Sequence, residues 1–333
     1  MTPRAQGLHV IPVDEDRLLL KRGIRQVLVS GAESQAVVRS LMPLLDGTRD
    51  ETEAIAALPD EQQEAGRALL DALLARDLLG DGQTFPEAPD ALQSAFYANF
   101  GAAGLGAPEE LRRAHVVVHG VGLVARSLLA GLADLGVGSV TWAEEENGVG
   151  EGVPADVTAA GSPGDPAAAD LLVATSDLGQ EEALLAVGRR ALAANVRFLP
   201  AWVSELIGFV GPLTIPFETA CLRCYQLRVD SNVADIAARR ALREHTALAP
   251  EVAASTGLLP PMAAVVGQVA AIEVAKALGG FAPSDAVGRS IELNLVSFRS
   301  DVRRVLKVPR CPDCGQDSRH ARRVVLSGPQ ITE

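Results

Sequence analysis

Four cysteines offer the clearest chemistry in this 333-residue sequence, because they occur as two Cys-x-x-Cys pairs. Cys221 pairs with Cys224, and Cys311 pairs with Cys314. Two such pairs can present four thiolates tetrahedrally to zinc, whereas a disulfide framework is not expected in a reducing compartment. Because 86 residues separate Cys224 from Cys311, the metal would join distant segments. We therefore predict one structural zinc bound by all four cysteines.

Zinc at this site would leave no thiol for covalent chemistry, since the chain has no fifth cysteine. Thioester or persulfide formation requires a thiolate that is free of metal. The five histidines lack the spacing of a metal site or a catalytic triad, and no Gly-x-Ser-x-Gly turn occurs. His115 and His119 bracket an apolar run, so we expect core or strand-end roles for them. The sequence thus predicts no catalytic residue.

A candidate nucleotide site begins where the β-prone run at 115–119 leads into Gly120-Val121-Gly122 and an amphipathic helix at 124–135. A second strand, 139–143, ends on Glu144, and a third strand, near 171–174, is followed by Asp177. This order is typical of a βαβ unit that places phosphate on the helix N-terminus and an acid on the ribose. Ala125 occupies the third glycine position of the motif, so the turn alone is weak evidence.

The cations that a triphosphate requires are missing near this site. No Lys, Arg or His occurs from residue 127 to residue 188, and residues 147–154 read NGVGEGVP. ATP activation requires positive charge around the phosphates. Arginines from a dimer partner, with Arg126, Arg189 and Arg190 available, would restore only part of it. We therefore expect intrinsic ATP activation to be lost, which puts ATP binding in doubt, with residual nucleotide-site positions at Gly120, Gly122, Glu144 and Asp177.

The first 82 residues predict a small α+β domain. Three β-prone runs, Leu8–Val13, Arg17–Leu20 and Gln26–Val29, indicate a three-stranded meander. A Ser30/Glu33 capping box starts the first predicted helix, and two more helices follow at 50–58 and 60–79. Three short helices after the strands describe a winged-helix-like domain. Two prolines mark 83–90 as the linker that follows it.

Charge argues against DNA binding by this domain. Residues 1–82 carry nine Lys or Arg against fourteen Asp or Glu, and the whole chain has a formal charge of −12. Phosphate and anionic membranes would be repelled. No apolar run approaches the ~20 residues of a membrane helix, and the start lacks a signal-peptide h-region. We expect a cytoplasmic protein, with no nucleic-acid or membrane partner, whose first domain either binds an extended peptide or serves only for packing.

Beyond the linker the pattern predicts an α/β sheet covered by helices. A helix is predicted at 181–194, and a long one at Met262–Leu278. Further strands are predicted near Phe198–Val203, Leu206–Val210 and Ser290–Val296.

Several motifs together give residues 91–320 a family resemblance. In chain order they are a predicted leading helix at Tyr97–Leu111, followed by HVVVHGVG, VTWAEEE, VATSD, GFVGPLTIPFETACLRC, VVGQVAAIEVAKAL and VPRCPDCG. This region resembles the ThiF/MoeB-like relatives of ubiquitin-activating enzymes, which implies a Rossmann-type sheet with structural zinc over 91–333. With a PqqD-like peptide-recognition element at 1–82, the chain is similar to ThiF-like leader-peptide-binding proteins of thiazole/oxazole-modified peptide and thiopeptide antibiotic biosynthesis. The resemblance implies that it binds a precursor's leader and presents the core peptide to a separate YcaO-type cyclodehydratase for azoline and azole formation.

Residue assignments for these partners follow from the expected architecture. The leader would add a strand beside one edge of the meander, although the sequence does not decide which edge is open. The expected leader-binding residues are Gln26, Val27, Leu28, Val29, Leu70, Leu73 and Leu74. A basic segment with Arg239 and Arg240 is either a docking face for an acidic leader or partner enzyme, or an ordinary solvated surface. The apolar Met262–Leu278 helix is a candidate surface for homodimerisation.

Rival hypotheses belong to other classes. One is an ATP-dependent ThiF-like adenylating enzyme that activates a carboxylate. Another, a nicotinamide-dependent oxidoreductase, has only Gly120-Val121-Gly122 in its favour. The cation-free stretch and the metal-committed cysteines favour a non-catalytic adaptor.

Overall fold

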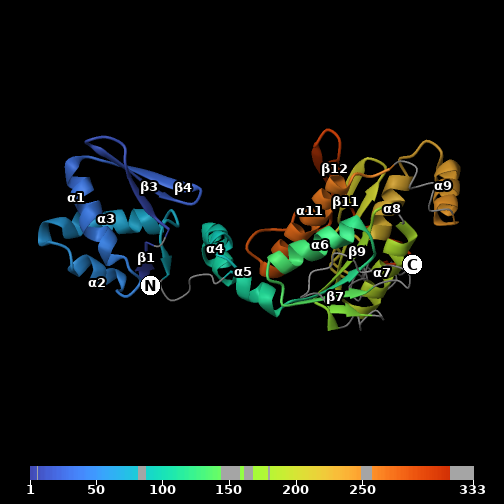
Figure 1. Cartoon of the computed structure of the whole chain (residues 1–333), viewed down its shortest axis with the longest axis horizontal. Helices are drawn as coiled ribbons and strands as arrows, with labels where there is room; N and C mark the ends of the chain where they lie inside the picture. Colours follow the sequence, from blue (N-terminus) through green and yellow to red (C-terminus); the bar gives the residue numbers. More distant parts are fainter. Residues whose placement is uncertain are drawn as a thin grey trace, which may run out of the picture. The chain divides into compact units, whose positions relative to one another are not determined.

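The protein is described by a computed structural model over residues 1–5, 7–81, 88–143, 158–160, 168–178, 181–248 and 257–315. Its chain divides into two compact units (Figure 1). The first unit contains Met1–Leu111 and Gly279–Ala282, and the second contains Arg112–Leu278 and Pro283–Glu333. The helical residues that follow the predicted linker therefore group with the first unit, whereas the sequence analysis placed the boundary near residue 90.

An antiparallel meander forms the sheet of the first unit. Its strands are β2 (His9–Pro12), β3 (Arg17–Arg22) and β4 (Arg25–Ser30), in the order β2-β3-β4, as the sequence predicted. Arg22 pairs with Arg25 across the turn, and Gly23 takes a positive φ of 54°. A glycine at the first turn position matches a two-residue type II′ hairpin. Within the described residues, β2 and β4 are the two edges of this sheet.

Three helices pack against the meander: α1 (Ala32–Leu41), α2 (Glu51–Ala56) and α3 (Gln63–Leu74). Alternate residues of β3 face them, because side chains along a strand alternate between its two faces. One apolar cluster joins the strand to the helices and includes Leu18, Leu20, Val38, Leu41, Ala54, Ile55, Leu70 and Leu73. The first unit thus has its own core.

The helices of the first unit differ from the predictions at their ends. Ser30 does not cap α1, because Gly31, with a φ of 97°, is the N-cap residue and no side chain caps the helix. A capping box exists instead at α2, where Asp50 accepts from the backbone N–H of Glu53. The third helix is shorter than 60–79, because a 3₁₀ turn (η2, Asp60–Gln62) precedes it and it ends at Leu74.

The remaining elements of the first unit fix the tip of the hairpin. β1 (Pro3–Arg4) pairs with β5 (Gly80–Asp81), and α4 (Ala91–Tyr97), η3 (Ala98–Phe100) and α5 (Gly101–Arg113) replace the single helix predicted from Tyr97 to Leu111. Asn99 of η3 accepts a hydrogen bond from the Ile24 N–H at 3.2 Å. Its carbonyl accepts from Arg25 at 2.5 Å. The β3–β4 turn is therefore held by the helical segment.

An eight-stranded sheet is the frame of the second unit (Figure 1). Its strands are β6 (His115–His119), β7 (Ser139–Ala143), β8 (Thr158–Ala160), β9 (Leu171–Ser176), β10 (Arg197–Ser204), β11 (Ile207–Val210), β12 (Arg289–Asn294) and β13 (Ser300–Arg304). The order is β13-β12-β11-β10-β9-β6-β7-β8. β6 to β10 pair in parallel, and β11 to β13 extend the sheet antiparallel. The α/β prediction is confirmed, while β8 and β13 were not predicted.

Helices cover both faces of this sheet. α6 (Leu123–Asp134) and α11 (Pro260–Gly279) share a cluster with Val116 and Val118, whereas α7 (Glu181–Ala194) and α8 (Leu222–Asp230) share another with Val117. Adjacent β6 residues therefore face opposite helical layers, which explains why the strand is apolar throughout. A further helix, α9 (Ile236–Leu248), follows α8.

α11 qualifies the expectation about membranes. Among the described residues it is the one helix long and apolar enough for a membrane span, with a mean hydropathy of 1.5, yet half of its apolar window is buried. It packs closely on α6, where the Ser127 hydroxyl donates to the Ala264 carbonyl at 3.0 Å. A Cβ at Gly267 would lie 2.7 Å from the Ser127 Cβ, so glycine permits this contact. Its hydropathy is that of a core helix.

Candidate functional site

The four cysteines come together in the second unit, as predicted. Cys221 is the N-cap residue of α8, Cys224 lies in the first turn of that helix, and Cys311 and Cys314 lie in the chain after β13. All four are buried, and their sulfur atoms lie within 4.8 Å of one another. The Sγ–Sγ distances are 3.8 Å for Cys221–Cys224, 3.7 Å for Cys221–Cys311 and 3.5 Å for Cys224–Cys314.

These distances fit a tetrahedral metal ion. Zn–S bonds of about 2.3 Å at tetrahedral angles place the sulfurs about 3.8 Å apart. The Val308 N–H donates to Cys224 Sγ at 3.3 Å, which is the kind of outer contact that stabilises a thiolate ligand. Hydrogen bonds from Cys221 and then Cys314 lower the pKa of Cys224. The four thiols are thus close enough to hold one metal ion, and their softness and geometry fit zinc.

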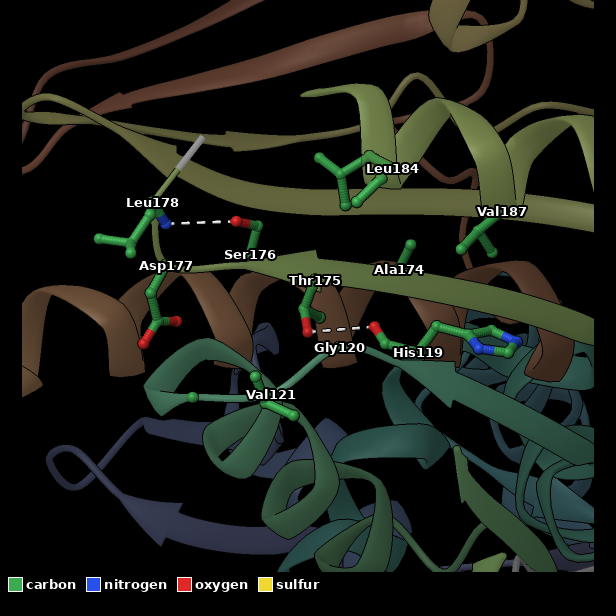
Figure 2. A pocket seen from close by; sticks show the side chains of 12 residues that line it. His119, Gly120, Val121, Ala174, Thr175, Ser176, Asp177, Leu178, Leu184 and Val187 are labelled. Atoms are coloured by element: carbon green, nitrogen blue, oxygen red, sulfur yellow. Dashed lines mark hydrogen bonds between the residues drawn. The ribbon is translucent and has the colours of Figure 1, made fainter. Parts of the chain in front are cut away.

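The glycine turn and two strand ends line a pocket of about 240 Å³ in the second unit (Figure 2). His119, Gly120, Val121 and Gly122 form one wall, and residues 174–178, at the end of β9 and directly after it, form the opposite wall. Ala183, Leu184 and Val187 of α7 close an apolar side. Gly120 has a φ of 116°, and a Cβ there would collide with the Thr175 carbonyl. Two glycines and the carboxyl ends of β6 and β9 therefore form a small open cavity, the arrangement in which α/β sheets bind ligands.

Asp177 occupies the N-terminus of α6. Its carboxylate accepts hydrogen bonds from the backbone N–H groups of Leu123 at 2.6 Å and Val124 at 2.9 Å. A Cβ at Gly122 would collide with the carboxylate, so glycine is required for this approach. Three of the four predicted nucleotide-site residues are thus brought together: Gly120, Gly122 and Asp177. Glu144, the fourth, lies outside the described residues, as does most of the acidic loop that follows it.

Sequence reasoning missed a cation that contacts a pocket residue, His119. Nη2 of Arg190 lies 3.0 Å from Nε2 of His119, the pocket residue at the end of β6. Burial and then the Arg190 charge lower the pKa of His119 to about 4, so the ring is neutral at pH 7 and accepts this hydrogen bond. The sequence analysis considered Arg190 only as a contribution from a dimer partner. Arg190 lies three residues after Val187 in the predicted helix at 181–194, so both side chains share one helix face, and this spacing could have indicated its position.

His115, the other histidine of β6, has the structural role expected. Its Nδ1 lies 3.0 Å from the Ala168 carbonyl and its Nε2 lies 2.9 Å from the Thr141 hydroxyl. Both ring nitrogens are therefore engaged in joining β6 to its neighbours.

In the first unit the predicted leader-binding residues divide into two groups. Along β4 the side chains of Gln26 and Leu28 are exposed, while Val27 and Val29 are partly buried against the core. Leu70 and Leu73 are 0% exposed, so the prediction that they contact a ligand is wrong for the folded state described here. They face inward because the buried stripe of α3 falls on them, and the half-buried residues beside them on α3 are Leu69 and Leu74.

The predicted docking pair is also divided. Arg239 lies 3.1 Å from Asp230 and 3.8 Å from Glu181, in an ion-pair network that Arg243 shares. Arg240 is exposed. Arg239 is therefore already paired with carboxylates of α7 and α8, whereas Arg240 is available, and docking at this pair stays a prediction.

Comparison with solved structures identifies the fold. No protein-family model matches the chain, and no curated protein sequence does. The structure of E. coli MccB with MccA-N7isoASN matches with a TM-score of 0.67 and 16% identity over 94% of this chain and 99% of that one. The heterocyclase TruD matches with a TM-score of 0.66 and 21% identity, over 94% of this chain and 42% of that one.

Two further matches describe bound molecules. E. coli MccB with ATP has a TM-score of 0.63, 15% identity and coverage of 94% and 99%. A heterocyclase in complex with substrate and cofactor has a TM-score of 0.63, 20% identity and coverage of 94% and 39%. At these identities the matches show the fold alone, and they agree with the expected mixed α/β architecture. Because one protein of this fold was solved with ATP, the doubt about ATP binding receives no support.

Proposed function

We propose that this chain binds the leader segment of a ribosomally made precursor peptide through its first unit and presents the core peptide to a separate YcaO-type cyclodehydratase. The open edge of β4, next to half-buried apolar side chains, is the observation that carries this proposal. The matched proteins include MccB with a MccA derivative and two heterocyclases, which supports a role in modifying peptides. The first unit would then be a PqqD-like, winged-helix recognition element.

The geometry of β4 suits an added strand. Hydrogen-bonded and non-hydrogen-bonded pairs alternate along an antiparallel ladder, and Arg22 and Arg25 close the two-residue turn. The pair Leu20–Val27 is then hydrogen-bonded, whereas the backbone groups of Gln26 and Leu28 point away from β3. An extended peptide can pair with those outward groups, which is how sheet edges bind peptides.

Apolar surface beside this edge supplies the side-chain contacts. Val27 and Val29 lie on the core side of β4 and are partly buried, and Leu69 and Leu74 of α3 are half-buried against the same cluster. By contrast, all four residues of β2 are exposed, so this other edge lacks a shielded apolar border. We therefore assign the leader to β4, with its apolar side chains meeting Val27, Val29, Leu69 and Leu74.

In this proposal the chain presents the core peptide, and a partner enzyme carries out the chemical modification of that peptide. This chain matches only 39% and 42% of the two heterocyclase chains. We propose that a separate cyclodehydratase supplies the catalytic part, with Arg240 among the groups that dock it. Holding the leader raises the effective concentration of the core peptide at the partner's active site. The second unit, with zinc at its four cysteines and the α11 surface available for homodimerisation, is the scaffold in this cytoplasmic assembly.

The test uses a phage-displayed library of 16-residue peptides selected on the full-length chain. Recovered peptides are synthesised with a fluorophore, and their affinities are measured by fluorescence polarisation for wild type, Leu28→Pro and Leu28→Ala. Leu28→Pro removes the outward N–H, so peptide binding is expected to weaken at least tenfold. Leu28→Ala keeps the N–H and is expected to change binding less than threefold. Equal affinities for the two variants, or no recovered peptides, would refute peptide binding at β4.

A second candidate function is ATP-dependent activation of a carboxylate. The convergence of Gly120, Gly122 and Asp177, with Arg190 on His119 in the same pocket, favours it, as does the structure of MccB with ATP. This candidate predicts ATP–pyrophosphate exchange by the purified chain with a peptide carboxylate. It also predicts that Asp177→Asn abolishes the exchange. Absence of exchange and of calorimetric ATP binding favours the adaptor.

A further inference from the structure

Arg22 is a largely buried cation without a hydrogen-bond partner among the described residues. The residue is 8% exposed, and within the described part of the chain it forms no hydrogen bond and no ion pair, while its side-chain nitrogens still reach solvent. Burial is the main cause that lowers its pKa, the charge of Arg25 acts in the same direction, and the charge of Asp77 opposes both. Cations in largely buried positions are normally paired. A guanidinium that reaches solvent from such a position can bind an anionic group.

The position of Arg22 relates it to the proposed peptide edge. In the ladder, Arg22 pairs with Arg25, Leu20 with Val27, and Leu18 with Val29. These pairs share the core side of the sheet, because residues two apart along a strand lie on one face. Arg22 therefore lies on the side of the sheet where Val27 and Val29 line the open edge.

Neighbouring described groups compensate the Arg22 charge only in part, because Asp77 acts on it from a distance but forms its ion pair with Arg25. Arg25 forms an ion pair with Asp77 at 3.0 Å and donates to the Asn99 carbonyl. Nη2 of Arg22 points instead to the chain after α3, where a Cβ at Gly80 would lie 3.2 Å from it. Among these described side chains there are two guanidinium groups and one carboxylate. The cluster therefore has one positive charge in excess, at the end of α3, in the same core face as the proposed peptide groove.

We propose that Arg22, supported by Arg25, binds an Asp or Glu side chain of the leader peptide. This inference rests on the proposed function. One carboxylate balances the single excess charge, and the planar guanidinium can hold it with two parallel hydrogen bonds. Arg22 is thus a specificity-determining residue at one end of the groove.

Strand alternation gives the proposal a sequence pattern. Side chains opposite Val29, Val27 and Arg25 would be two residues apart in an added strand. A peptide antiparallel to β4 would read apolar-x-apolar-x-acidic from its N-terminus. A peptide parallel to β4 would read in the opposite order. In either orientation, the acidic residue therefore lies two residues from the nearest apolar residue, on the same face of the added strand.

The experiment repeats the 16-residue peptide selection on full-length wild type, Arg22→Met, Arg22→Lys and Arg304→Met. Met keeps an apolar stem of comparable length without charge, Lys restores the charge, and Arg304→Met, on exposed β13 of the second unit, is the matched control. We expect Asp or Glu at a fixed two-residue spacing from apolar residues in peptides recovered on wild type and on Arg304→Met, and loss of this enrichment on Arg22→Met. Arg22→Lys is expected to recover part of it.

Affinities then test whether Arg22 and the acidic residue interact. A recovered peptide and its Glu→Gln or Asp→Asn form are measured against each protein by fluorescence polarisation. The amide change is expected to weaken binding at least tenfold on wild type and less than twofold on Arg22→Met, because the partner charge is gone. The melting temperature of peptide-free Arg22→Met is expected to equal or exceed that of wild type, whereas a purely structural arginine would lower it.

Each other result is decisive. Acid-independent selection, or equal losses from the amide change on both proteins, overturns the Arg22 assignment and leaves peptide binding intact. A failure to recover peptides on wild type overturns the proposed function, and the Arg22 assignment with it.

Discussion

In the first unit Arg22 is 8% exposed and has no hydrogen-bond partner among the described residues, whereas in the second unit the carboxylate of Asp177 accepts two N–H groups of α6. Both charges lie beside a surface that can bind a ligand. The Arg22 charge is compensated only in part, by Asp77, and the Asp177 carboxylate already fills the place where an anion would bind at a helix N-terminus. A phosphate at α6 must displace this carboxylate or share a cation with it.

This difference separates the two candidate activities physically. Peptide binding at β4 would give the Arg22 guanidinium a carboxylate partner and requires no rearrangement of the core. Nucleotide binding at the glycine turn would reorganise an existing cap. The two sites can therefore be perturbed independently, and the following predictions test that independence from the largest expected effect to the smallest.

Removal of metal from the four cysteines is expected to have the largest effect. Structural zinc contributes about 10–16 kcal/mol of apparent binding free energy in zinc-finger peptides. Cys224→Ser, or incubation with a strong chelator, is therefore expected to remove the bound zinc measured by elemental analysis and to lower the melting temperature of the second unit by more than 10 °C, an order-of-magnitude expectation. Peptide affinity at β4 is expected to change less than threefold. A zinc-free wild-type protein with the same melting temperature would contradict the assignment.

The cysteine site and the glycine turn were predictable because local sequence specifies them. Two Cys-x-x-Cys knuckles restrict the chemistry to a few metals, and Gly120 and Gly122 follow a wholly apolar strand. The meander was predictable for the same reason, since alternating runs and the Gly23 turn define it. Each cysteine pair, the glycine turn and the hairpin depend on residues close together in the chain.

Features that depend on the packing of distant segments were not predictable. The sequence shows that α3 has an apolar stripe, but burial of Leu70 and Leu73 and exposure of their neighbours depend on how the helix meets the sheet. Arg239 is neutralised by Asp230 and by Glu181, which is 58 residues away in sequence. That Arg22 has no hydrogen-bond partner among the described residues is likewise visible only in the fold.

Gly120→Ala is expected to destabilise the second unit by about 3 kcal/mol, because the φ of 116° is strained for alanine and the new Cβ would collide with the Thr175 carbonyl. Gly106→Ala in α5 is the matched control. That glycine is helical and exposed, and a Cβ there meets nothing within 4 Å. Alanine is expected to stabilise it by about 0.5–1 kcal/mol. Urea unfolding measures both changes, and equal effects would contradict the described turn geometry.

His119 is expected to make the stability of the second unit depend on pH. The unfolded chain binds a proton at the ordinary histidine pKa of about 6.5, whereas the folded chain holds the pKa of His119 at about 4. Its contribution is therefore complete above pH 6.5 and is lost as the pH falls toward 4, by about 3 kcal/mol. His119→Gln is expected to flatten this part of the profile measured by urea unfolding. An unchanged slope would show that His119 is accessible to protons in the folded protein.

Asp177→Asn is expected to have the smallest effect on stability, a loss of about 1 kcal/mol, because the amide oxygen still accepts one N–H while the charge near the helix N-terminus is lost. Asp90→Asn in the first unit is the matched control. Asp90 also accepts two backbone N–H groups, from Leu92 and Gln93, at the start of α4. Urea unfolding is expected to give similar losses for the two variants.

Ligand binding should distinguish these two caps. Without Mg²⁺, pyrophosphate is expected to bind Asp177→Asn more tightly than wild type, since the competing carboxylate charge is gone, and Asp90→Asn is expected to bind it as wild type does. With Mg²⁺, the adenylating candidate requires the opposite order, because a carboxylate holds the metal that neutralises the phosphates. Calorimetry with and without Mg²⁺ therefore measures a difference whose sign separates the two functions. Wild-type and Asp177→Asn proteins that bind pyrophosphate equally under both conditions would show that the carboxylate at α6 does not control this pocket.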